Sequence, residues 1–228
     1  MKIFKLSKIA VYISVVTAFS GASVFAASNS TLTQSITAGV LSSDVLTSLR
    51  SPVAAPTAAM SAKQFSFNCQ NGVNASSGAL GTDSERLYVS NPSAAANGWT
   101  LSIAATAGAS AAWQNAGATK SFDYNDPTTG GCSDGVDTDT AAGQLTIDPS
   151  IGSLITDCSA CTTTGVTKGS SASFSEGTIN SITLLSAAAN SDDVWRGYLT
   201  AVDLKQTIPA ETPVDAYSIN LTLTATAL

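Results

Sequence analysis

The sequence predicts an all-β protein, a β-sandwich of antiparallel strands with long polar loop insertions. Short runs of alternating apolar and polar residues recur along the chain, and clusters of Gly, Asn, Pro and Ser separate them. Helical periodicity is almost absent, whereas strict alternation is the pattern of a half-buried strand. Many such runs with turn signals between them favour two stacked sheets or a barrel.

The expected strands can be placed in order along the chain. After Asn97-Gly98, a dipeptide typical of turns, Trp99, Leu101 and Ile103 share one face and predict a core strand. The run 217–225 is the longest alternating stretch in the chain. Further strands are expected over 32–38, 65–69, 86–91, 145–147, 179–185 and 194–202, and less regularly over 151–155.

Residues 1–26 have the pattern of a secretory signal peptide. Lys2, Lys5 and Lys8 precede an apolar stretch, 9–19, and Val24-Phe25-Ala26 supplies small residues for cleavage. The alternative is an uncleaved anchor helix, but the apolar stretch is shorter than the ~20 residues that a membrane span needs. We expect a secreted chain in which residues 27–228 form a single sandwich domain with a loop insertion around 123–143.

Charge and composition exclude several functions. The chain has 10 Lys and Arg against 16 Asp and Glu; without the three signal-peptide lysines, 10 − 3 = 7 and 7 − 16 gives −9. Such a chain lacks the basic surface that nucleic acid or anionic lipid requires, so we expect neither nucleic-acid binding nor membrane insertion after cleavage. There is no histidine, and nothing pairs Glu176, Asp192 or Asp193 across a cleft, so we expect no catalytic residues.

Four cysteines, an even number in an exported chain, indicate two disulfides with three possible connectivities. We favour Cys158–Cys161 as a short loop and Cys69–Cys132 as a long bridge. One alternative is a four-thiolate zinc site. Such a site typically uses two Cys-x-x-Cys pairs, and this chain has one. The other is a redox-active Cys158-x-x-Cys161. Such a motif generally stands at the start of a helix, and the Thr-Thr-Thr-Gly that follows disfavours a helix.

An acidic stretch lies within 123–139. Calcium takes oxygen ligands from carboxylates, amides and carbonyls, and extracellular sites often sit in such loops. The spacing does not match an EF-hand, so a hydrophilic loop without metal is the other interpretation. If calcium binds, the expected ligands are Asp123, Asp126, Asp134, Asp137 and Asp139. The same stretch contains Asn125, which is not one of the expected ligands. No other cofactor is expected.

The stretch Gly98-Trp99-Thr100-Leu101 resembles the first Trp-x-Leu motif of the WxL-domain surface proteins of Gram-positive bacteria. The C-terminal segment is similar as well: Pro209 and Pro213 precede a Tyr217-led last strand, although Leu-Thr-Leu-Thr stands where the family has a second tryptophan. The segment 34–41 resembles the family's opening strand. The resemblance implies a secreted β domain that binds peptidoglycan non-covalently, often with partner surface proteins. Its motif residues would be Trp99, Leu101, Tyr217, Leu221 and Leu223.

Three hypotheses about function follow. The first is a non-catalytic cell-surface protein held non-covalently by the cell wall or by other surface proteins. The second is a self-assembling subunit of a surface layer or fibre, in which copies exchange an unpaired terminal strand, 217–225 or 32–38. The third is a secreted carbohydrate-acting enzyme.

Overall fold

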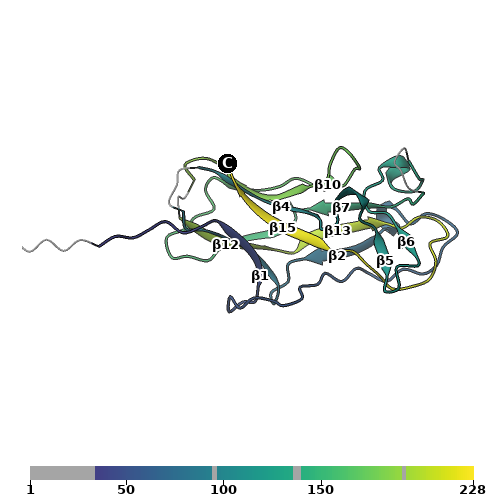
Figure 1. Cartoon of the computed structure of the whole chain (residues 1–228), viewed down its shortest axis with the longest axis horizontal. Coiled ribbons are helices and arrows are strands. Elements are labelled where there is room, and N and C mark those ends of the chain that lie inside the picture. Colours follow the sequence, from purple (N-terminus) through teal and green to yellow (C-terminus); the bar gives the residue numbers. More distant parts are fainter. Residues whose placement is uncertain (1–33, 94–96, 136–139, 192–193) are drawn as a thin grey trace, which may run out of the picture. The chain divides into compact units, whose positions relative to one another are not determined.

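The structure, a computed structural model, describes residues 34–93, 97–135, 140–191 and 194–228 (Figure 1). The chain divides into a unit of residues 1–37 and a unit of residues 38–228. In the first unit the described residues, 34–37, form no helix or strand, so the described part of the strand expected over 32–38 is not a strand. The expected signal peptide, 1–26, lies outside the described residues.

The second unit is nearly all β, which confirms the predicted fold class. Helical structure among its described residues is confined to the short 3-10 helices η1 (Gly72–Asn74), η2 (Gly108–Ser110) and η3 (Thr128–Gly130). The strands are β1 (Ser42–Leu46), β2 (Ser76–Leu80), β3 (Arg86–Asn91), β4 (Trp99–Ala105), β5 (Trp113–Asn115), β6 (Ser121–Phe122), β7 (Gln144–Asp148), β8 (Ser153–Thr156), β9 (Val166–Lys168), β10 (Ala172–Ser173), β11 (Ile182–Ala187), β12 (Trp195–Thr200), β13 (Val202–Thr207), β14 (Tyr217–Ser218) and β15 (Leu221–Ala227).

The strands pair antiparallel in four sheets, ordered β1-β3-β12-β8, β10-β7-β13-β2, β15-β4-β11-β9 and β14-β5-β6 (Figure 1). The first two sheets are continuous, because β12 runs into β13 with only Ala201 between them. Ala201 has a left-handed φ of 56°, and its N–H donates to the Gly81 carbonyl at 2.7 Å. A left-handed residue interrupts the strand pairing and bends the sheet at this point.

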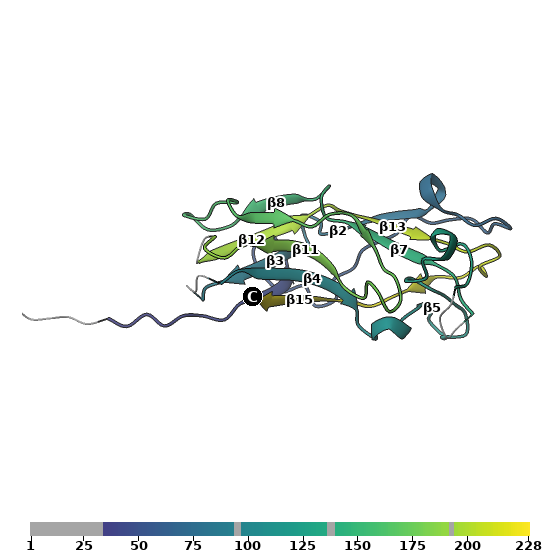
Figure 2. The same cartoon turned by 90° about the horizontal axis from the view of Figure 1, so that it is seen from above.

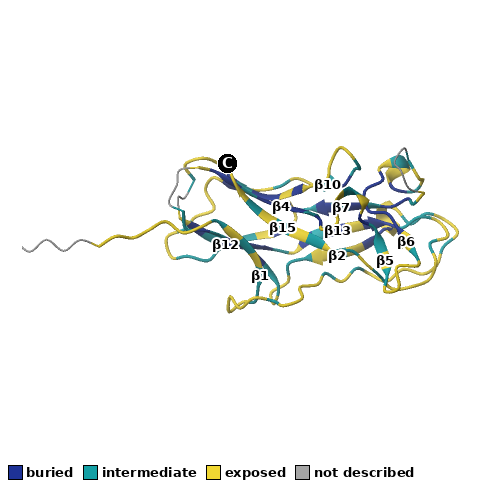
Figure 3. Cartoon of the chain, viewed as in Figure 1, coloured by how far each residue is buried: buried dark blue, intermediate teal, exposed yellow. Residues whose placement is uncertain are grey.

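The sheet that contains β4 packs on the sheet that contains β12, and the core lies between them (Figure 2). Along β4, buried residues alternate with half-buried ones, as the sequence predicts for Trp99, Leu101 and Ile103 (Figure 3). The Trp99 indole meets the Trp195 indole of β12 with ring centroids 5.2 Å apart. The strand 99–105 is therefore a central core strand.

Gly98 explains why glycine precedes this strand. A Cβ at this position would collide with the carbonyl oxygen of Ala187, at the end of β11. The Gly98 carbonyl also accepts a hydrogen bond of 2.9 Å from the Leu228 N–H, after the end of β15. Glycine therefore allows two neighbouring strands to close on the start of β4.

Two further expected strands differ in the structure. The stretch 65–69 forms no strand, because the Ser66 hydroxyl accepts a hydrogen bond from the Asn68 N–H at 3.0 Å and donates to the Asn68 carbonyl at 2.7 Å. Such a local turn competes with strand pairing. The run 217–225 is split, since β14 pairs with β5 whereas β15 pairs with β4.

Both expected disulfides are present. Cys69 bonds to Cys132 across 63 residues, and Cys158 bonds to Cys161 across three. All four cysteines are thereby used, so the zinc alternative is wrong, and no helix follows Cys161 as the redox alternative would require. The long bridge ties the segment before β2 to the acidic loop.

Candidate binding site

The small sheet β14-β5-β6 carries an aromatic face. Trp113 and Phe122 are direct partners across β5 and β6, and their rings stack with centroids 5.8 Å apart and planes inclined by 8°. The Tyr217 ring of β14 meets the Phe122 ring edge to face at 5.0 Å. Two successive strands and a third that is distant in the sequence therefore place three rings side by side.

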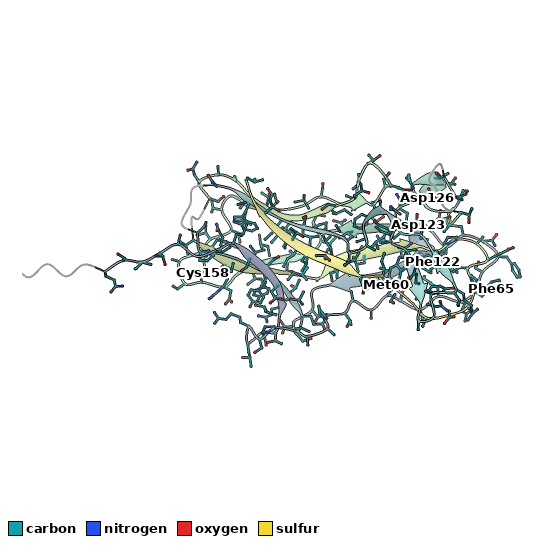
Figure 4. All side chains as sticks on the ribbon, in the orientation of Figure 1. Met60, Phe65, Phe122, Asp123, Asp126 and Cys158 are labelled. Carbon is teal, nitrogen blue, oxygen red and sulfur yellow. A yellow bond between two sulfur atoms is a disulfide. The ribbon has the colours of Figure 1, made fainter. Side chains whose placement is uncertain are left out.

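This face lines a pocket of about 430 Å³. The opposite wall comes from the irregular segment 60–66 and from the loop after β13. Phe65 lies at this pocket and packs edge to face with Phe67, which is 75% exposed. Figure 4 shows Phe65, Phe122, Asp123 and Asp126 at the same end of the sandwich and Cys158 at the opposite end. Phe65 therefore adds a fourth ring to the pocket, on the side of segment 60–66.

A buried amide fixes the orientation of the largest ring. The Trp113 indole N–H donates to Gln206 Oε1 at 2.8 Å. Gln206 is itself buried, and its Nε2 donates to the carbonyls of Thr207 at 2.7 Å and Asp123 at 3.1 Å. Because all of these bonds hold one rotamer, the indole is preorganised, and the pocket is linked to the start of the acidic loop.

The pocket lining also includes Asp215, which belongs to an ion pair. Asp215 lies 3.0 Å from Lys120 Nζ and accepts a hydrogen bond of 2.9 Å from Asn115 Nδ2. The Lys120 bond, followed by those of Asn115 and the Ala216 N–H, lowers the pKa of Asp215. The Tyr217 hydroxyl donates to the Pro213 carbonyl at 2.6 Å, and burial raises the pKa of this phenol. Asp215 is thus held as a carboxylate beside a neutral tyrosine.

A second cavity, of about 450 Å³, adjoins the pocket and shares Met60, Trp113 and Tyr217 with it. It opens between the two layers of the sandwich, and its lining includes Ile103 of β4 and Leu204 of β13. It is lined largely by aliphatic side chains, so the two cavities together form an aromatic pocket next to an apolar cleft.

The five residues expected to form a wall-binding motif do not form one surface. Trp99 and Leu101 are buried in the core, where they cannot touch a ligand. Leu221 and Leu223 are half-buried on β15, pack against the core and line the apolar cleft. Tyr217 alone reaches the aromatic pocket.

The expected calcium ligands are also divided. Asp123 and Asp126 are buried, whereas Asp134 is exposed, and Asp137 and Asp139 lie outside the described residues. Within the ranges that the structure describes, no three acidic, His or Cys side chains gather as a metal site. Asn125, which was not among the expected ligands, is buried beside Asp126.

The sequence did not indicate the aromatic pocket. β5, β6 and β14 span only two or three residues, too few for an alternating pattern, and Phe122 lies directly before the acidic stretch. The clearest signal was the exposed-aromatic pair Phe65 and Phe67, whose alternation predicted a strand instead.

The pocket lining can hold a ligand. Rings, amides and hydroxyls can hold a ligand by stacking and hydrogen bonds. Hydrolysis of a glycosidic bond generally needs two carboxylates across the bond, and Asp215 is the single carboxylate among the described lining residues.

Comparisons with family models, curated proteins and solved structures gave no match to this chain. Among the described residues, no helix is both long and apolar enough to cross a membrane.

Proposed function

We propose that this chain is a secreted, non-catalytic protein of the cell surface, held non-covalently by the cell wall or by other surface proteins. The observation that carries this proposal is the preorganised aromatic pocket of Trp113, Phe122 and Tyr217, with Phe65 at its mouth. We assign ligand contact to this pocket rather than to Trp99 and Leu101, whose burial limits them to a structural role.

The chemistry of the pocket fits a glycan that carries amide groups, such as peptidoglycan. Aromatic rings pack well against the apolar faces of sugars, and pockets of this kind add a few polar groups that fix orientation. Asp215 and Lys63 supply an acceptor and a donor in the pocket lining. The export pattern of residues 1–26 and the two disulfides support a place outside the cytosol.

The test is co-sedimentation of the purified secreted chain with insoluble peptidoglycan. We expect the wild type to sediment, and the variant Phe65→Ser with Phe67→Ser to bind about tenfold more weakly, because losing an aromatic anchor generally costs more than 1 kcal/mol of binding. Both rings are outside the core, so this variant should keep its fold. Val73→Ser with Ile151→Ser removes two exposed apolar side chains elsewhere and should bind like the wild type. A wild type that stays in the supernatant contradicts wall binding.

A second candidate function, self-assembly, is favoured by the edge of one sheet. β15 pairs only with β4, so among the described strands its outer edge has no hydrogen-bonded partner. Unpaired edges accept added strands, and the apolar cleft beside β15 could take alternate side chains of that strand. The donor would be the segment 34–40 of a second copy, in which Ile36 is 92% exposed.

Concentration-dependent light scattering tests this candidate. Ile36→Asp should abolish polymer formation, because it places a charge on the apolar face of the donor segment. Val73→Asp, at a site that is 99% exposed, adds the same charge elsewhere and should leave polymers intact. A wild type that stays monomeric at high concentration contradicts self-assembly.

A further inference from the structure

We propose that the turn 123–126 holds a calcium ion, bound by the side-chain oxygens of Asn125 and Asp126. Each of these residues is 1% exposed. Asn125 Oδ1 and Asp126 Oδ2 are buried acceptors, and neither has a hydrogen-bond partner among the residues that the structure describes. Buried polar atoms in native structures are nearly always satisfied, so two such oxygens on adjacent residues indicate a missing ligand.

Each side chain is held by its other polar atom. Asn125 Nδ2 donates to the Ala109 carbonyl at 3.0 Å, which fixes the amide. Asp126 Oδ1 accepts the Thr128 N–H at 2.8 Å, which fixes the carboxylate. This leaves Asn125 Oδ1 and Asp126 Oδ2 available, each in a fixed direction. This is the preorganisation that a metal site requires.

The charge of Asp126 needs a partner. No ion pair among the described residues includes it, although a buried carboxylate is costly unless a cation or donors neutralise it. More negative charge lies nearby. The Glu176 N–H donates to the Asn125 carbonyl at 2.8 Å.

The available donors select the metal. They are amide and carboxylate oxygens, while the chain has no histidine and its four cysteines are in disulfides. Hard cations prefer such a set, and calcium accepts the irregular geometry and mixed ligands of a loop more readily than magnesium does. The Cys69–Cys132 disulfide ties down the same loop, which lowers the cost of ordering it around an ion.

Thermal melting of the full secreted chain tests the site. In 10 mM CaCl2 we expect the midpoint to rise by about 5–10 °C over that in EDTA, as follows for an affinity of about 10⁻⁴ M, typical of extracellular sites. Asp126→Asn keeps the acceptor for Thr128 but loses the charge, so it should melt normally in EDTA and lose the calcium shift. Asp148→Asn is the matched control. Asp148 Oδ1 accepts the Ser150 N–H at 3.0 Å in the same kind of turn, so this variant should keep the shift.

A second measurement needs no variant. Terbium bound at this turn would lie beside Tyr124, so excitation of tyrosine should give terbium emission that calcium displaces and equimolar magnesium does not. Absence of a melting shift in the wild type, an equal shift in Asp126→Asn, or terbium emission that calcium leaves unchanged would each overturn the proposal. Failure here leaves wall binding untouched, because the aromatic pocket does not include Asn125 or Asp126.

Discussion

The indole of Trp99 packs against the indole of Trp195, with centroids 5.2 Å apart and planes inclined by 38°, and joins the two layers of the sandwich. The indole N–H of Trp195 also donates to the carbonyl of Thr162 at 2.9 Å, and Thr162 directly follows the Cys158–Cys161 loop. The contact between Trp99 and Trp195 therefore helps to set how the sheet of β4 packs against the sheet of β12. Trp99 therefore has a structural role between the two layers.

The first prediction concerns Trp99→Ala. Removing a fully buried ring leaves a cavity and should lower the free energy of unfolding by about 3–5 kcal/mol, as large-to-small core substitutions do. Urea denaturation followed by circular dichroism measures this loss. The control, Val73→Ala on the surface, should change stability by less than about 0.5 kcal/mol. A cost for Trp99→Ala as small as that of the control would place the ring outside the core.

The second prediction compares the two disulfides. Cross-links that close longer loops restrict the unfolded chain more. The 63-residue separation of Cys69 and Cys132 corresponds to about 4 kcal/mol on the loop-entropy model, and the three-residue separation of Cys158 and Cys161 to about 2 kcal/mol. Replacing each pair by Ala, one pair at a time, and measuring unfolding in urea tests this order. A larger loss from the short bridge would reverse it.

The fold class and the disulfides could be read from the sequence because they depend on local signals. Alternation along 99–103 sets which side chains are buried, whatever their partners. The even cysteine count and the three-residue spacing of Cys158 and Cys161 left few pairings. The break of 217–225 into β14 and β15 could not be read in this way, because it depends on which neighbouring strand each half meets.

The candidate sites depend on contacts between distant segments. Trp113, Phe122 and Tyr217 meet only because three very short strands pair. The acidic stretch suggested calcium, but the composition could not separate buried Asp126 from exposed Asp134, nor single out Asn125. What sets Asn125 and Asp126 apart is their burial and their hydrogen bonds. The Ala109 carbonyl orients the side chain of Asn125, and the Thr128 N–H orients that of Asp126.

The third prediction concerns the ionisation of Tyr124. Burial, and then the charges of Asp123 and Glu176, raise the pKa of this phenol from 10.0 to about 12. Its hydroxyl donates to the Gly108 carbonyl at 3.0 Å, a bond that the ionised form cannot make. Because the folded pKa is the higher one, the contribution of Tyr124 to stability is complete below pH 10 and is lost as the pH rises through about 12. We expect up to about 2 kcal/mol of this pH-dependent loss to disappear in Tyr124→Phe.

Absorbance at 295 nm resolves this titration directly. In the folded chain at high pH, one tyrosine should ionise near pH 12, and this late step should be missing in Tyr124→Phe. Tyr217→Phe serves as the control. Burial also raises the pKa of Tyr217, but the neighbouring Lys120 partly offsets this rise. Removing the Tyr217 hydroxyl should therefore leave the latest ionisation step in place. If Tyr124→Phe retained the late step, the tyrosine that ionises last would not be Tyr124.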